Sequence, residues 1–199
     1  MDLPSKEIEA LWRLRHAGNP RAVAATVPSD MFSQIYATAR KHPQFILPGL
    51  PTEKPDTLPE ASEETPQQGA PIHFMQWTFP APDTATVLFT HLAEYKLRGQ
   101  YAQPHTTITH HMELSGPKGL VLCQGSVPEG RGVTMEEAKW LLLCMQKFYN
   151  TGNVDAQTEQ SGDVGKELSK RRRRLIEQFS AGSSAFNVTE LLDVAERMG

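Results

Sequence analysis

The stretch that decides the fold runs from Ala93 to Leu114 and reads AEYKLRGQYAQPHTTITHHMEL. Just before and into it, residues 86–95 alternate between two faces with a period of two, which is typical of a strand. Gly99 and Pro104 then interrupt the pattern, and from His105 the β-branched run 106–109 favours a second strand. The pattern predicts a long antiparallel hairpin whose two strands are joined by about ten residues.

Further strands and helices are expected on both sides of this hairpin. Alternation over residues 72–79 predicts one strand, and residues 119–127, which follow a Ser-Gly-Pro turn sequence, predict another that is antiparallel to the hairpin. Residues 22–27 form a short apolar piece, and residues 45–47 a short extended anchor. Apolar side chains three and four residues apart predict helices near residues 5–15, 29–41, 135–149, 166–179 and 188–198. Two of these begin with capping boxes, at Thr134/Glu137 and Asn187/Glu190.

This order of elements predicts an α+β fold. We expect an antiparallel β-sheet of about four or more strands, covered on one face and packed with N-terminal and C-terminal helices. Residues 1–47 form an N-terminal helical segment in this interpretation, and residues 72–199 form the α+β core, with a mobile connector near 150–162. Residues 48–71 contain six of the 15 prolines and five acidic residues, so we expect a disordered acidic Pro-rich insertion.

The composition excludes several classes of protein. The chain has 199 residues and a net charge of −3, and its pI near 6.2 argues against generic nucleic-acid binding. Its apolar stretches are too short to cross a bilayer, so no membrane insertion is expected. Residues 1–6 show no targeting signal. Two cysteines, Cys123 and Cys144, in apolar surroundings predict buried, inert thiols.

Catalytic motifs are missing from the sequence. It contains no phosphate-binding loop, no dinucleotide fingerprint and no nucleophile elbow, so we expect no enzyme activity and no cofactor. His105, His111 and a residue on a facing strand would be the best metal ligands. Adjacent His110 and His111 point to opposite faces of a strand and cannot share an ion, so ordinary hydrogen-bonded histidines are favoured and no metal site is predicted.

Five consecutive cations, Lys170 to Arg174, are the sharpest electrostatic feature. They cover more than one helical turn and so form a solvated collar on the predicted helix 166–179. Such a collar suits a nucleic-acid or ribosome-associated binding module, although a plain soluble helix face explains it about as well. No aromatic side chain for base stacking stands beside it.

Several separated blocks of the chain resemble one family. The blocks are WRLRHAGNPRAVAATVPSDMF (12–32), ARKHPQFILPGLP (39–51), the 93–114 stretch and GLVLCQGSV (119–127). They are similar to the mitochondrial ATP synthase F(1) complex assembly factors, chaperones of the β subunit. The resemblance extends over about residues 5–51 and 72–198.

The resemblance implies a molecular chaperone of the mitochondrial matrix without catalytic activity. Its partner would be the free ATP synthase F(1) β subunit, which exposes apolar surface before it pairs with the α subunit and aggregates unless that surface is covered. We expect the chain to act as a monomer. The resemblance assigns no roles to individual residues.

A partner-binding surface can be suggested from residue types alone. Aromatic and arginine side chains anchor many interfaces. They gather on the first helix and around the 99–104 loop, and the candidates are Trp12, Arg13, Arg15, Tyr95, Arg98, Tyr101 and His105. For Trp12, burial in the core is the main alternative.

Overall fold

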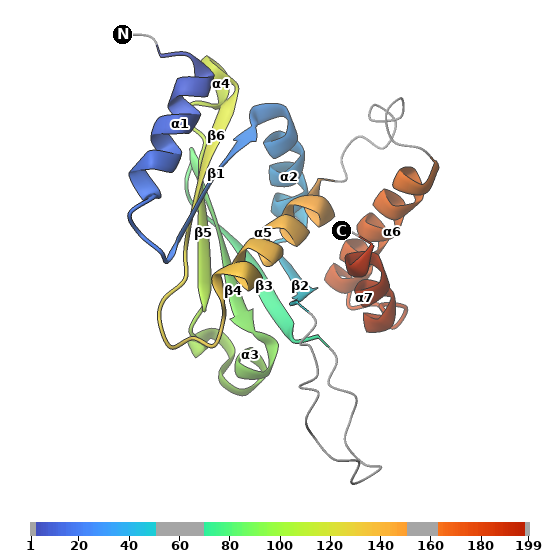
Figure 1. Cartoon of the computed structure of the whole chain (residues 1–199). Helices are drawn as coiled ribbons and strands as arrows, with labels where there is room; N and C mark the ends of the chain where they lie inside the picture. Colours follow the sequence, from blue (N-terminus) through green and yellow to red (C-terminus); the bar gives the residue numbers. More distant parts are fainter. Residues whose placement is uncertain (1–2, 51–69, 151–162, 198–199) are drawn as a thin grey trace.

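The computed structural model describes residues 3–50, 70–150 and 163–197, and its centre is one antiparallel sheet of six strands (Figure 1). The strands lie in the order β1-β6-β5-β4-β3-β2. Their bounds are β1 Ala22–Pro28, β2 Gln44–Pro48, β3 Ile72–Ala81, β4 Thr84–His91, β5 Thr106–His111 and β6 Leu120–Ser126. The expected α+β class is therefore confirmed.

Seven α-helices and one 3-10 turn accompany this sheet in the described ranges. They are α1 Ser5–His16, α2 Ser29–Lys41, α3 Leu92–Arg98, η1 Gly99–Tyr101, α4 Ser115–Lys118, α5 Met135–Tyr149, α6 Asp163–Ser180 and α7 Val188–Glu196. No helix in these ranges combines the length and the apolar character that a membrane span requires.

One face of the sheet holds the main core. Buried side chains alternate along the strands and point to this face. The helices α2, α5, α6 and α7 pack on this side of the sheet (Figure 1). Phe45 of β2 is fully buried there, and its ring contacts Phe148 of α5, Phe179 of α6 and Phe186 before α7. Burial of such aromatic side chains contributes roughly 1.5–3 kcal/mol each. The hydrophobic stripes of the helices thus fix where the C-terminal elements lie.

The predicted hairpin is correct in its pairing and wrong in its length. β4 and β5 pair antiparallel, but the strand expected to reach Tyr95 ends at His91 and is followed by α3. Leu92 and Tyr95, three residues apart, both pack against the core, and this helical spacing replaces the period of two. Gly99 ends the helix with φ +56°, a backbone conformation that favours glycine.

The N-terminal segment contributes more to the sheet than the sequence indicated. Residues 22–27, expected only as a short apolar piece, belong to β1, which pairs with all of β6. The anchor at residues 45–47 is part of β2, which pairs with β3. The helical segment 1–47 therefore holds two helices and both edge strands of the sheet. Most of the 48–71 insertion and of the 150–162 connector lies outside the described residues.

The two predicted capping boxes are half confirmed. The Thr134 hydroxyl accepts a hydrogen bond from the Glu137 backbone N–H, and the Asn187 side chain accepts from Thr189 and Glu190. The carboxylates of Glu137 and Glu190 were expected to complete these boxes. Both instead contact residues of other elements, His73 and the arginines of α6, so tertiary contacts take precedence over local capping.

Candidate functional site

The sheet face opposite the helix layer carries α1 at one end and α3 at the other. The Trp12 ring of α1 contacts His111, and the Tyr95 ring of α3 stacks on Phe74 with centroids 3.9 Å apart. His111 and Phe74 alternate along their strands with the core residues His110 and Met75, so they belong to the outer face. Both helices therefore lie on the same side of the sheet.

Helix α1 has no buried residue, and Trp12 is one of its contacts with the rest of the chain. The indole N–H of Trp12 donates to the Cys123 carbonyl at 3.0 Å, so Trp12 faces the sheet. Arg13 and Arg15 are exposed, and Arg13 lies 3.8 Å from Glu9. Leu11 and Leu14 are 52% and 71% exposed and form what we call the α1 patch.

The segment formed by α3 and η1 divides its side chains in the same way. Tyr95 lies half-buried on the sheet, while Arg98 is exposed and 4.0 Å from Glu94. Leu97 and Tyr101 are 82% and 76% exposed, the highest values among the large apolar side chains described, and we call this pair the α3 patch. Isolated exposed leucines are ordinary, but two such patches on one sheet face suit a partner.

A polar strip of sheet lies between the two helices. Its half-buried side chains come from the four central strands and are mostly polar: Gln76, Thr86, Thr107, Thr109 and Gln124, with Leu88 among them. The hydroxyls of Thr86 and Thr109 lie 3.3 Å apart. This outer face therefore offers polar groups between two apolar patches.

His105, the last of the predicted binding residues, is not on this surface. It is 1% exposed and lies just before β5, where its Nε2 is 2.9 Å from Nδ1 of His73 and its Nδ1 is 2.9 Å from the Thr106 hydroxyl. Burial, followed by the neighbouring His73 and His91, lowers the pKa of His105 to about 3. The ring is therefore neutral at physiological pH. Because it is buried, His105 is not part of the candidate binding surface.

The structure brings together a histidine set that the sequence did not predict. His105 and His111 do not meet, because His111 is on the outer face beside Trp12. Within the described ranges, the cluster that is able to hold a metal ion consists of His73, His91 and His105. Register alone would have paired His73 with His91, because they are direct partners in β3 and β4.

The basic run of α6 is largely engaged within the chain. Arg171 lies 3.2 Å from Glu190 and 2.8 Å from Asp193 on α7, and Arg174 also contacts Glu190. Arg173 lies 2.9 Å from Glu177 on its own helix. These carboxylates offset much of the positive charge, which weakens the alternative of a nucleic-acid or ribosome-associated module.

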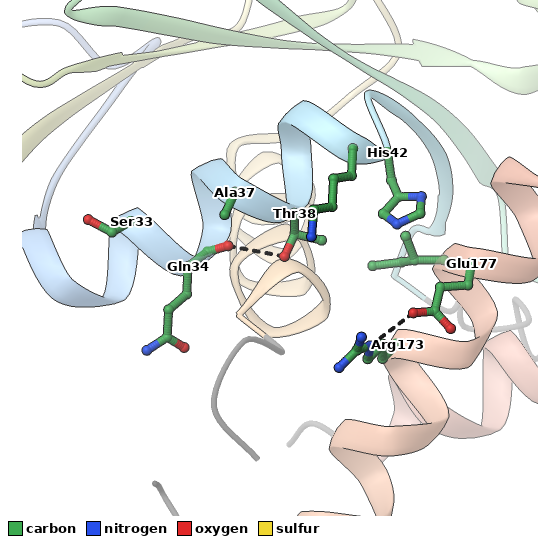
Figure 2. Close-up of a pocket in the computed structure, with 9 residues that line it drawn as sticks. Ser33, Gln34, Ala37, Thr38, His42, Arg173 and Glu177 are labelled. Atoms are coloured by element: carbon green, nitrogen blue, oxygen red, sulfur yellow. Dashed lines mark hydrogen bonds and ion pairs between the residues drawn. The ribbon is translucent and has the colours of Figure 1, made fainter. Parts of the chain in front are cut away.

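A hollow of about 420 Å³ lies between α2 and α6 (Figure 2). Figure 2 shows Gln34 and Thr38 on the α2 wall and the paired Arg173 and Glu177 on the α6 wall. The His42 imidazole, at the end of α2, bonds to the Ser180 hydroxyl at 2.8 Å, and burial lowers its pKa. Ser180, the hydroxyl partner of His42, is not among the residues that line the hollow.

The two thiols are free and buried, as predicted. Burial raises the pKa of Cys123 and of Cys144 to about 12, so both remain protonated at physiological pH. A protonated thiol is a poor nucleophile and a poor ligand.

Comparison with known proteins then decides the family. The model of the family described as ATP11 protein matches residues 1–192. The chain belongs to the ATP11 protein family. A curated relative from Schizosaccharomyces pombe, named mitochondrial protein atp11, is 34% identical over 182 residues, which are 92% of this chain and 54% of the relative. The chain thus spans about half the length of that relative.

Sequence reasoning chose the candidate binding residues of this ATP11 chain by residue type rather than by position on each helix. Trp12 and Tyr95 attracted attention as aromatic residues, and both face the sheet. Leu14 and Leu97 were overlooked, although both are exposed on the same helices. A helical reading of residues 92–98 would have found Leu97, because it lies on the side of that helix away from Leu92 and Tyr95.

Proposed function

We propose that this ATP11-family chain is a non-catalytic mitochondrial assembly factor that binds the free F(1) β subunit of ATP synthase in the matrix. In this role it keeps the β subunit from aggregating until the α subunit takes its place in the α/β hexamer. The membership in the family and the mitochondrial relative support the general role. The choice of the β subunit rests on the resemblance of the sequence to assembly chaperones of that subunit.

The observation that carries the proposal is the pair of apolar patches on the outer sheet face. Leu14 and Leu97 expose 71% and 82% of their surface, on helices that contribute no buried residue to the core. Exposed apolar side chains of this size lower the solubility of the chain by itself. They become favourable when they cover apolar surface on another protein.

The charged residues around the patches suit reversible binding. Arg13, Arg15 and Arg98 are exposed beside the apolar side chains. A chaperone has to leave its client, and interfaces of modest size with polar surroundings dissociate more readily than obligate ones. Arginine supplies directional contacts without adding a large apolar area.

Capture of isolated subunits tests this function. The purified chain is mixed with the β subunit or the α subunit alone, and light scattering of the client is followed at a temperature where it aggregates. We expect selective capture of β, suppression of its aggregation and release when α is added. Capture of neither subunit, or equal capture of both, would contradict the proposal.

A variant pair locates the contact. Arg98→Ala with Tyr101→Ala removes two exposed side chains of the α3 segment and should weaken capture of β while leaving the domain folded. Leu143→Ala on α5 is the matched control, because Leu143 is also exposed, at 40%, but lies on a helix of the opposite sheet face. Unchanged capture by the double variant would remove the α3 segment from the binding surface.

A further inference from the structure

Three histidines of neighbouring strands converge at one end of the sheet. His73 of β3, His91 of β4 and His105 before β5 each offer a nitrogen, and these three atoms all lie within 4.8 Å of one another. The ring centroids are 4.6–5.2 Å apart. His73 and His105 are buried, and His91 is half-buried. Three imidazoles are a usual ligand set for Zn²⁺ and for related divalent transition metals.

The outer nitrogen of each ring already has a partner of its own. His73 Nε2 is 3.0 Å from the Glu137 carboxylate, and His91 Nε2 is 3.0 Å from the Arg131 carbonyl. Both oxygens only accept, so these two Nε2 atoms carry the hydrogens and the Nδ1 atoms carry lone pairs. His105 Nδ1 lies 2.9 Å from the Thr106 hydroxyl. Histidine ligands of metals are oriented by such carboxylate, carbonyl and hydroxyl partners.

The three nitrogens lie within 4.8 Å of one another and have to adjust their spacing to share one ion. His73 Nδ1 and His105 Nε2 are 2.9 Å apart, and in this arrangement His105 donates to the His73 lone pair. A tetrahedral ion with nitrogens at 2.0–2.1 Å separates its ligand atoms by about 3.3 Å. The Thr106 hydroxyl accepts as readily as it donates, so His105 is able to move its hydrogen to Nδ1 and free Nε2 for the metal.

Packing around the cluster is tight at the carboxylate. A Cβ at Gly49 would lie 2.6 Å from the Glu137 oxygen and 2.7 Å from His73 Nε2. Glycine at this position therefore lets the backbone approach the contact between Glu137 and His73. The side chain of Glu137 is 14% exposed, so this carboxylate is shielded and interacts with nearby charge more strongly than a surface carboxylate would.

We propose that His73 Nδ1, His91 Nδ1 and His105 Nε2 form a binding site for Zn²⁺ or a related divalent transition metal, with Glu137 as the orienting carboxylate. The ion would link β3, β4 and the start of β5 on the inner face of the sheet, beside the first turn of α5 that carries Glu137. Water or another small ligand would complete the coordination. This inference is independent of the proposed chaperone function.

Metal titration of the full chain tests the site. After chelator treatment and dialysis, Zn²⁺ binding is measured by calorimetry, and Co²⁺ binding by its visible absorption, which is strong for four-coordinate sites and weak for six-coordinate surface binding. We expect one ion per chain and intense Co²⁺ bands. Absence of binding by the unaltered chain would overturn the proposal.

Matched variants assign the ligands. His91→Asn removes a half-buried ligand with little disturbance of the core, and His105→Asn removes a buried one; each should abolish the Co²⁺ bands. His111→Asn is the control, because it removes a half-buried histidine of the other sheet face. Glu137→Gln should keep the site but weaken it by roughly 10–100-fold. Circular dichroism verifies that each variant is folded, and stoichiometric binding that survives in folded His91→Asn would refute the assignment.

Discussion

The two faces of the sheet carry their helices in different ways. On the inner face, α5 buries Leu141, Met145 and Phe148 completely, and α2, α6 and α7 complete a continuous core. On the outer face, α1 and α3 have no buried residue, and their contacts with the strands include the half-buried rings of Trp12 and Tyr95. The inner helices therefore stabilise the fold, whereas the outer helices present side chains to the surroundings. The same residue type, leucine, has opposite roles on the two faces.

The largest effect expected is on the inner face. Phe45→Ala removes a fully buried ring that contacts four other aromatic rings, and it should lower the free energy of unfolding by about 3–5 kcal/mol. Urea denaturation measures the change. A loss below about 1 kcal/mol would mean that the inner face is not the stabilising one.

The next effect depends on pH. His110 is fully buried between Trp77 and Phe32, and this burial lowers its pKa from 6.5 to about 4. As the pH falls, the unfolded chain binds the proton at a higher pH than the folded chain does. The contribution of His110 to the free energy of unfolding is therefore fully present above about pH 6.5 and falls by about 3 kcal/mol as the pH approaches 4.

Unfolding free energies of the unaltered chain and of His110→Gln, measured between pH 7 and 4.5, isolate this contribution. The variant cannot titrate at this position and should show a shallower decline. Identical pH profiles would exclude His110 as a source of the acid sensitivity.

A smaller effect is expected at Gly49, where the backbone meets the histidine cluster. A methyl group there overlaps Glu137 and His73, so Gly49→Ala should cost about 1–3 kcal/mol. Gly18→Ala is the control, because an added Cβ there meets nothing within 4 Å. Thermal melts measure the stability of both variants. Equal melting temperatures would show that Glu137 and His73 move away from the added methyl group at little cost.

The smallest effect on stability is expected on the outer face. Leu14→Ala and Leu97→Ala each remove a side chain that is more than two-thirds exposed, so each should change the free energy of unfolding by less than about 0.5 kcal/mol. Denaturation of the two variants provides the measurement. A larger loss would indicate that these leucines support the fold.

The sequence predicted the inner face better than the outer one. The period-two pattern of the strands and the wide apolar stripes of the helices indicate which residues are buried, so the α+β class could be predicted. The caps at Thr134 and Asn187 could be predicted from their residue types and positions. Residues 92–98 were misread because a short amphipathic helix and a strand end look alike over seven residues.

Contacts between distant segments could not be read from local patterns. Glu137 matches a capping box by spacing, yet its carboxylate contacts His73, which is 64 residues away. The meeting of His73, His91 and His105 depends on strand register, which a period-two pattern alone does not set. Exposure of Leu14 and Leu97 likewise depends on which side of each helix rests on the sheet.

The most direct test compares binding and stability in the same protein. Affinity for the isolated β subunit is measured for the unaltered chain, for the double variant Leu14→Ala/Leu97→Ala and for Leu143→Ala, together with their unfolding free energies. We predict that the double variant binds β about tenfold more weakly or worse, with almost unchanged stability, while Leu143→Ala binds normally. Full affinity in the double variant would contradict the outer face as the chaperone surface.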